Sequence, residues 1–140
     1  MPKMGFEGEI YYGAAGTTAA TLLQNIRDEN YDFDHDKGDT TIRGDGSAPP
    51  VETGQVTIRK VTLGWNMTND TTDTSLAALL TATYGGTPVA IRTKDRAAGK
   101  GFDGDVYLKV KHGKPLRGEQ TYDFSVDTVT RENRNPQLYV

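Results

Sequence analysis

Alternation of apolar and polar residues is clearest over residues 55–67, where it predicts the longest strand of the chain. The apolar residues change parity at Arg59 and Lys60. Because successive side chains of a strand point to opposite faces, this change indicates a β-bulge, or a strand whose two ends face different surroundings. The apolar positions are Val56 and Ile58 before the change, and Val61, Leu63, Trp65 and Met67 after it.

Shorter strands are predicted on both sides of this segment. Apolar and polar residues alternate over most of residues 106–111 and 119–130, which is typical of strands with one buried face. We interpret residues 6–12, 22–33 and 88–94 as further strands, the second of them with a bend. The pattern as a whole therefore predicts a mainly β fold.

One helix is predicted at Thr71–Tyr84, directly after the long strand. Its apolar residues recur at helical spacing and form a single stripe. Asp70 or Thr71 can cap the N-terminus, and Gly85 and Gly86 would end the helix. The stripe consists of Leu76, Leu79, Leu80 and Tyr84.

Residues 34–54 contain many Gly and Asp residues and a Pro–Pro pair, but almost no apolar side chains. Such a segment cannot bury a face of its own, and a loop of this length in a compact domain is usually functional or disordered. We predict an extended loop through which the chain binds copies of itself. Residues 131–140 are predicted to form a C-terminal arm, and residues 1–140 a single domain.

The composition narrows the possible functions. The net charge is -3, with both signs spread along the chain, which does not match the basic surface of a nucleic-acid-binding protein. The chain has no cysteine, which excludes disulfides and thiolate sites. No apolar leader and no membrane-spanning stretch is visible, so we expect a protein made in the cytoplasm.

None of the candidate chemical motifs satisfies its pattern. The acidic residues from Asp34 to Asp45 suggest a calcium loop, but Gly38 and Asp39 reverse the required order of oxygen ligand and glycine. Residues 98–101 lack the first glycine and the hydroxyl residue of a phosphate-binding loop. No serine lies in a nucleophile elbow. We therefore expect no enzyme, no metal and no cofactor.

One basic cluster lies around the turn predicted at residues 112–118. The solvated end of a hairpin explains such a cluster. The functional alternative is an acidic partner, either a phosphate or the carboxylates of residues 34–45 in another copy of the chain. The cluster consists of Lys109, Lys111, His112, Lys114 and Arg117.

A series of segments follows the long strand: W-N-M-T-N-D, D-T-S-L-A-A-L-L-T-A, G-T-P-V-A-I, G-x-G-F-D-G-D-V and P-L-R-G-E-Q-T-Y-D-F-S. In their order and texture they resemble the tail tube (major tail) proteins of tailed bacteriophages. The resemblance runs from about Val56 to Thr130, and the first strand and the long loop fit the same layout. The short N-terminal pattern of the secretion-system tube protein, which shares this fold, does not occur here.

The resemblance implies a β-sandwich or barrel with one flanking α-helix and a long inter-strand loop. Six copies would join their sheets edge to edge into a ring, and stacked rings would form the hollow tube through which the genome leaves the capsid. DNA would pass without specific binding, and no membrane would take part. The other partners would be tail proteins such as the tape measure and the terminator. The protein would belong to the virion tail, assembled in the bacterial host cytoplasm.

Two groups of residues are predicted to act in this assembly. Residues of the long loop and of the C-terminal arm would contact neighbouring subunits. Aspartates on the polar face of the last strand would face the lumen and repel DNA phosphates, so that replacing them by Lys would slow genome ejection. The interface residues are Asp36, Asp39, Arg43, Asp45, Pro49, Pro50, Leu138 and Tyr139, and the lumenal residues are Asp123 and Asp127.

Other functions stay open at the level of the sequence. A carbohydrate-binding or adhesion β-sandwich would expose an aromatic platform, but Trp65 follows the apolar parity of its strand. A small hydrolase would need a deep pocket with a pair of carboxylates. A tail terminator, or another tube component of an injection machine, would share the structural class.

Overall fold

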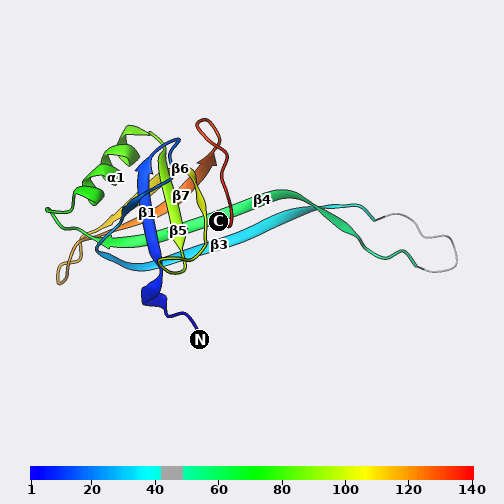
Figure 1. The fold of residues 1–140 in the computed structure, drawn as a ribbon, viewed down its shortest axis with the longest axis horizontal. Coiled ribbons are helices and arrows are strands. Elements are labelled where there is room, and N and C mark those ends of the chain that lie inside the picture. Colours follow the sequence, from blue (N-terminus) through cyan, green and yellow to red (C-terminus); the bar gives the residue numbers. More distant parts are fainter. Residues whose placement is uncertain (42–48) are drawn as a thin grey trace. The chain divides into compact units, whose positions relative to one another are not determined.

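The computed structural model describes residues 1–41 and 49–140. Its strands form one antiparallel seven-stranded sheet in the order β2-β1-β5-β6-β7-β4-β3 (Figure 1). The expected mainly β fold with one flanking helix is confirmed. In chain order the elements are η1 (Gly5–Glu7), β1 (Glu9–Ala14), β2 (Thr21–Leu22), β3 (Ile26–Asp39), β4 (Gly54–Thr68), α1 (Thr74–Gly85), β5 (Val89–Lys94), β6 (Asp103–Gly113) and β7 (Thr121–Thr130).

The chain divides into two compact units. One unit comprises residues 1–30 and 63–140 and is called the body; the other comprises residues 31–62 and is called the hairpin. Every buried residue that the structure describes belongs to the body. Among the described residues, the body therefore has a core of its own and the hairpin has none.

The core of the body lies on the sheet face against which α1 packs (Figure 1). Register brings apolar pairs together on that face, among them Val110 opposite Phe124 and Val106 opposite Val129. Trp65 of β4 stacks on Phe124 with ring centroids 5.5 Å apart and an interplanar angle of 18°. The largest fully buried side chains are Phe102, Phe124, Ile10, Leu63, Met67, Leu79, Ile91, Val106 and Asp105.

The limits of α1 differ from the prediction at the N-terminus. Asp73 caps the helix, since its carboxylate accepts the backbone N–H groups of Ser75 and Leu76 at 3.1 and 3.2 Å. Asp70 instead closes the preceding turn, where it accepts the N–H of Thr72 at 3.0 Å. The expected C-terminal stop is correct, because Gly86 takes the left-handed conformation with φ 70°.

The apolar stripe of α1 is shorter than expected. Leu76 and Leu79 are buried and Leu80 is half-buried, but the Tyr84 side chain is 74% exposed. Tyr84 lies in the last turn, next to Gly85 and Gly86, so the apolar stripe continues past the part of the helix that is buried. The inclusion of Tyr84 in the packed stripe was therefore wrong.

Strand limits differ most at three places. Phe6 lies in the short turn η1 and is 85% exposed, because the N–H of Gly8 bonds to the carbonyl of Gly5 at 3.2 Å before β1 begins. β6 begins at Asp103, before the alternation that starts at residue 106. β3 continues to Asp39, past the expected start of the long loop. There the backbone forms the strand although the side chains are polar.

Candidate assembly surfaces

The two edges of the sheet carry backbone groups that the rest of the described chain does not cover. On one edge, β2 pairs only with Tyr11 and Tyr12 of β1. On the other edge, β3 has β4 as its single neighbour. Backbone N–H and C=O groups at such edges are templates for pairing with another chain. The expectation that sheet borders stay available for other copies is therefore consistent with the described strands.

The hairpin exposes apolar side chains without burying any described residue. Phe33 is 48% exposed, Val56 46% and Ile58 53%. Polar contacts join its two segments, including, just beyond β3 and β4, the Thr40 N–H that donates to the Thr53 carbonyl at 3.1 Å. Groups of exposed apolar side chains often mark a surface that contacts another molecule.

The predicted interface residues of the hairpin take part in local polar contacts. Asp36 forms an ion pair with Lys60 at 2.9 Å, and the carboxylate raises the pKa of Lys60. Asp39 accepts the N–H of Thr41 at 2.8 Å, and the hydrogen bonds from Thr41 lower the pKa of Asp39. Pro49 and Pro50 are exposed, whereas Arg43 and Asp45 lie outside the described residues.

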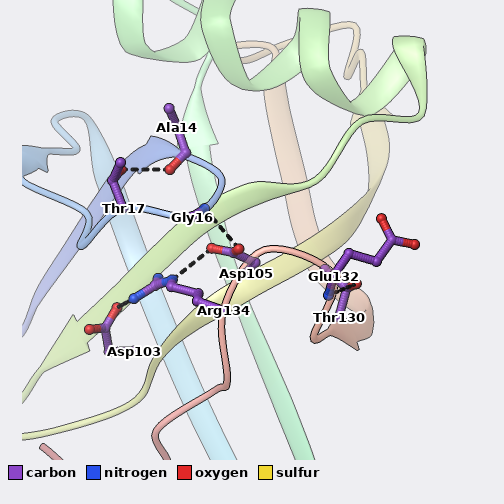
Figure 2. Close-up of polar contacts among 8 residues, drawn as sticks. All are labelled: Ala14, Gly16, Thr17, Asp103, Asp105, Thr130, Glu132 and Arg134. Carbon is purple, nitrogen blue, oxygen red and sulfur yellow. Dashed lines mark hydrogen bonds and ion pairs between the residues drawn. The ribbon is translucent and has the colours of Figure 1, made fainter.

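The C-terminal segment is held on its own body by an ionic cluster (Figure 2). Arg134 Nε lies 2.8 Å from Asp105 Oδ1, and its Nη1 lies 2.8 Å from Asp103 Oδ1. The second carboxylate oxygen of Asp105 accepts the backbone N–H of Gly16 at 2.9 Å. Burial by itself would lower the pKa of Arg134, but Asp105 and Asp103 together raise it above its ordinary value.

Backbone hydrogen bonds extend this attachment to the end of the chain. Gln137 pairs with Asp103 through bonds of 2.7 and 2.8 Å, and Val140 pairs with Gly101 through bonds of 2.9 and 3.0 Å. Leu138 is half-buried, and the Tyr139 ring is 74% exposed. Residues 137–140 thus add to the sheet of their own body. The sequence did not reveal this attachment, because Asp103, Asp105 and Arg134 look like ordinary surface charges.

The predicted lumenal residues lie on the strand that pairs with both β4 and β6. Asp123 is exposed and stands opposite Asn66 on one side and Lys111 on the other. Asp127 is also exposed and lies at the register shift of β6 and β7, between Val126 and Thr128. The face that carries Asp123 also carries lysines, so it is of mixed charge rather than uniformly acidic.

The basic turn between β6 and β7 is partly built into the body. His112 stacks on Tyr122 with ring centroids 4.1 Å apart, and its Nε2 lies 3.0 Å from Gln120 Oε1. The next residues, 114–117, are all exposed. Leu116 is 99% exposed, between the cations Lys114 and Arg117. The turn therefore presents an apolar side chain flanked by positive charges.

Residues 1–41 and 49–140 contain no group of three or more His, Cys, Asp or Glu side chains that could hold a metal ion. Trp65 is 4% exposed, so it provides no aromatic platform for a carbohydrate. Within the same described residues, no helix has both the length and the apolar character needed to cross a membrane.

Comparison with solved structures identifies the same fold elsewhere. A chain from the tail of an empty gene transfer agent particle with C6 symmetry matches with a TM-score of 0.73 and 13% identity, over 98% of either chain. A chain from the virion of a native gene transfer agent particle matches with a TM-score of 0.67 and 12% identity, over 92% of this chain and 99% of that one.

The SPP1 tail tube provides a third match. Its TM-score is 0.69 at 12% identity, over 99% of this chain and 78% of that one. No protein-family model and no curated protein sequence matches the chain. The resemblance to tail tube proteins that the sequence indicated is thus confirmed at the level of the fold.

Proposed function

We propose that this chain is the repeating subunit of a tail tube, in which rings of six copies stack into a hollow conduit. The observation that carries the proposal is the match along nearly the full length of both chains to a tail solved with C6 symmetry. A match of this extent accounts for the long hairpin as well as the body. The role is structural, and neither catalysis nor a cofactor is part of it.

The sheet edges supply a physical route to a ring. A cyclic assembly joins two different surfaces of each subunit, so one surface must complement the other. The edge at β1 and β2 and the edge at β3 are two such surfaces, and each has backbone groups to offer. Pairing one edge with the other in the next copy would close the sheets around an axis and leave no edge open.

The hairpin is the second element that we assign to subunit contacts. Its exposed Phe33, Val56 and Ile58 would become buried against a neighbouring copy, which would supply the core that the hairpin lacks. Asp36, Asp39, Arg43, Asp45, Pro49 and Pro50 belong to the same segment and are proposed as contact residues. From the C-terminal segment, the exposed Tyr139 ring and Leu138 are proposed to contact a neighbour, while the backbone stays on its own body.

Asp123 and Asp127 are proposed to face the lumen. Negative charge at the wall would repel DNA phosphates and let the genome slide without specific binding. Because Lys111 stands opposite Asp123, the local charge is balanced, and we expect Asp123→Lys to make the wall attractive to DNA. In a phage that carries this subunit, ejection should be slower with Asp123→Lys than with Asp123→Asn. Equal ejection rates would contradict the lumenal assignment.

The proposed location is the virion tail, with assembly in the bacterial host cytoplasm. The tape measure and the terminator are the proposed further partners, because a tube of defined length needs a length gauge and a stop. These assignments follow from the proposed role and would be tested by co-purification with tail proteins.

Negative-stain microscopy of the concentrated, purified chain tests the central proposal. We expect hollow rings or tubes. Single rings that never stack would instead favour a terminator, and a particle that stays monomeric at millimolar concentration would contradict self-assembly.

A proline variant tests whether the edge of the hairpin takes part. The Thr40 N–H, just after β3, points at Thr53, just before β4, and N–H directions alternate along an extended chain. The Lys37 N–H therefore points away from β4, to the edge. Lys37→Pro removes that donor in a place where an edge strand tolerates proline. We expect loss of assembly with Lys37→Pro and normal assembly with the control Lys37→Gln.

A further inference from the structure

A groove with a volume of about 680 Å³ lies in the body, between the start of β1 and the start of β3. Ile10 and Leu23, which are 1% and 5% exposed, form its apolar floor. Phe6 and Leu22 also line it and stay exposed. The groove thus offers apolar surface next to the edges of the sheet.

Carboxylates dominate the charge of this groove. Glu9, Asp28 and Glu29 line it, and the single cation in the lining, Arg27, donates to Glu119, which follows the basic turn, at 2.7 Å. Glu29 is held close to the backbone, because a Cβ built on Gly8 would lie 2.7 Å from Glu29 Oε1. Burial first, and then the charge of Glu9, raises the pKa of Glu29. A cation placed in the groove would therefore relieve an unfavourable arrangement of negative charge.

The turn at residues 114–117 has the complementary chemistry. Leu116 is the apolar tip of this turn and is 99% exposed in its own subunit, so it fills no groove of its own body. Lys114 and Arg117 flank it, and both are exposed. An apolar side chain between two cations matches an apolar floor lined by carboxylates.

We propose that the Lys114–Arg117 turn of one copy docks into the groove between β1 and β3 of a second copy. Leu116 would lie on the apolar floor, and the two flanking cations would face the carboxylates of Glu9, Asp28 and Glu29. This contact rests on the proposed self-assembly and names one of its interfaces. It is a head-to-tail contact, in which two different surfaces meet, as stacked or cyclic copies require.

Pairs of cysteine variants test the contact directly, because the chain has no cysteine of its own. Leu22→Cys marks the groove and Leu116→Cys marks the turn. The two variants are mixed at assembling concentration and oxidised, and disulfide-linked dimers are measured on a non-reducing gel. We expect at least about tenfold more of the mixed dimer than in a mixture of Leu22→Cys with Tyr84→Cys, whose site on α1 is also exposed to solvent.

A third mixture distinguishes the rival occupant. Ile58→Cys marks the exposed apolar part of the hairpin. If Leu22→Cys forms dimers with Ile58→Cys and not with Leu116→Cys, the hairpin of another copy fills the groove, and the proposed contact is wrong.

Charge reversal gives an independent test. One variant carries Lys114→Glu and Arg117→Glu; the other carries Asp28→Lys and Glu29→Lys. Each alone places like charges in every contact, so the concentration needed for assembly should rise at least about tenfold. In an equimolar mixture the variants alternate with opposite charges at each contact, and assembly should recover. High salt should weaken this recovery.

The outcomes separate this contact from the proposed function. If the wild-type chain forms tubes and both reversed variants do so at the same concentration, the contact is wrong and the tube subunit stands. If each variant fails alone, keeps its melting temperature and is not rescued by the other, the contact is also wrong. If the wild-type chain never assembles, both the proposed function and the contact fail.

Discussion

The two halves of β4 both alternate apolar and polar residues, but they differ in whether the apolar side chains are buried. Val56 and Ile58, in the hairpin, are 46% and 53% exposed, whereas Leu63, Trp65 and Met67, in the body, are at most 4% exposed. Alternation creates an apolar face in both halves. Burial of that face needs a partner, and among the described residues only the body provides one, in side chains such as Phe124 of the neighbouring strand β7. The body therefore holds the described core of the subunit, and the hairpin exposes apolar side chains that we propose another copy covers.

The largest expected difference between the two units, measured as free energy of unfolding, comes from removing a large core side chain. Phe124→Ala deletes a ring that is 1% exposed and stacked on Trp65, which should cost about 3–5 kcal/mol of unfolding free energy. Ile58→Ala in the hairpin should change it by less than about 0.5 kcal/mol and should instead reduce tube formation. Urea unfolding of the unassembled subunit measures the first effect and microscopy the second. Equal losses of stability would contradict the division into two roles.

The ion pairs of the two units allow a second comparison of stability. Arg134→Met leaves the fully buried Asp105 without its cation and should cost about 3 kcal/mol of unfolding free energy. In the hairpin, Lys60→Met breaks an exposed pair with Asp36 and should leave the melting temperature unchanged. Thermal unfolding of both variants makes the comparison. A similar change in both would mean that burial does not decide the strength of these pairs.

Aspartates that accept backbone N–H groups in the two units allow a third comparison, with a smaller expected loss of stability. Asp73→Ala removes the N-cap of α1 and should cost about 1 kcal/mol. Asp39 accepts an N–H two residues ahead in much the same way, but it lies exposed in the hairpin, and Asp39→Ala should lower the melting temperature much less than Asp73→Ala does. Asp73→Ser, which keeps a capping oxygen, should recover most of the loss in the body. Failure of that recovery would exclude capping as the cause.

The smallest expected effect is a pH dependence of opposite sign in the two units. The pKa of Glu29 in the body is raised by burial and then by Glu9, so ionisation of Glu29 opposes folding, and its unfavourable contribution disappears as pH falls through the folded pKa. The pKa of Asp39 in the hairpin is lowered by Thr41, so its contribution is favourable above the unfolded pKa and is lost on acidification.

Melting temperatures measured between about pH 4 and about pH 8 test this difference, because this range runs from near the ordinary carboxyl pKa to well above it. Glu29→Gln should melt above the wild type at neutral pH, and the gap should close toward acid pH. Asp39→Asn should show no such gain at neutral pH. A Glu29→Gln variant that is less stable than the wild type at neutral pH would contradict the raised pKa.

Much of the fold could be predicted because it depends on local patterns. The long strand ending at Thr68, the helix with its stop at Gly86, and the strand with Tyr122 and Phe124 inward all follow from alternation, helical spacing and glycine. The exposed Tyr84 and Phe6 were missed, because spacing defines a face without showing where the packed surface ends.

Some of the candidate surfaces could likewise be predicted from the sequence, and others could not. The sequence marked the 34–54 segment and the basic turn as unusual. The described residues of that segment are exposed or half-buried, and residues 114–117 of the turn are exposed. It did not indicate the groove, because Glu9, Ile10, Leu23 and Glu29 meet only when β1 and β3 are brought together. It also did not indicate the attachment of residues 137–140 to residues 101–103.

By itself, then, the sequence determined which segments form strands or a helix, which faces are apolar, and that charge is spread rather than concentrated. These properties are set by neighbours a few residues away. Only the tertiary structure decided which apolar faces are covered, which aspartates are buried against Arg134, and which strand stands at an edge. Those outcomes depend on contacts between residues far apart in the chain, and no local pattern encodes such contacts.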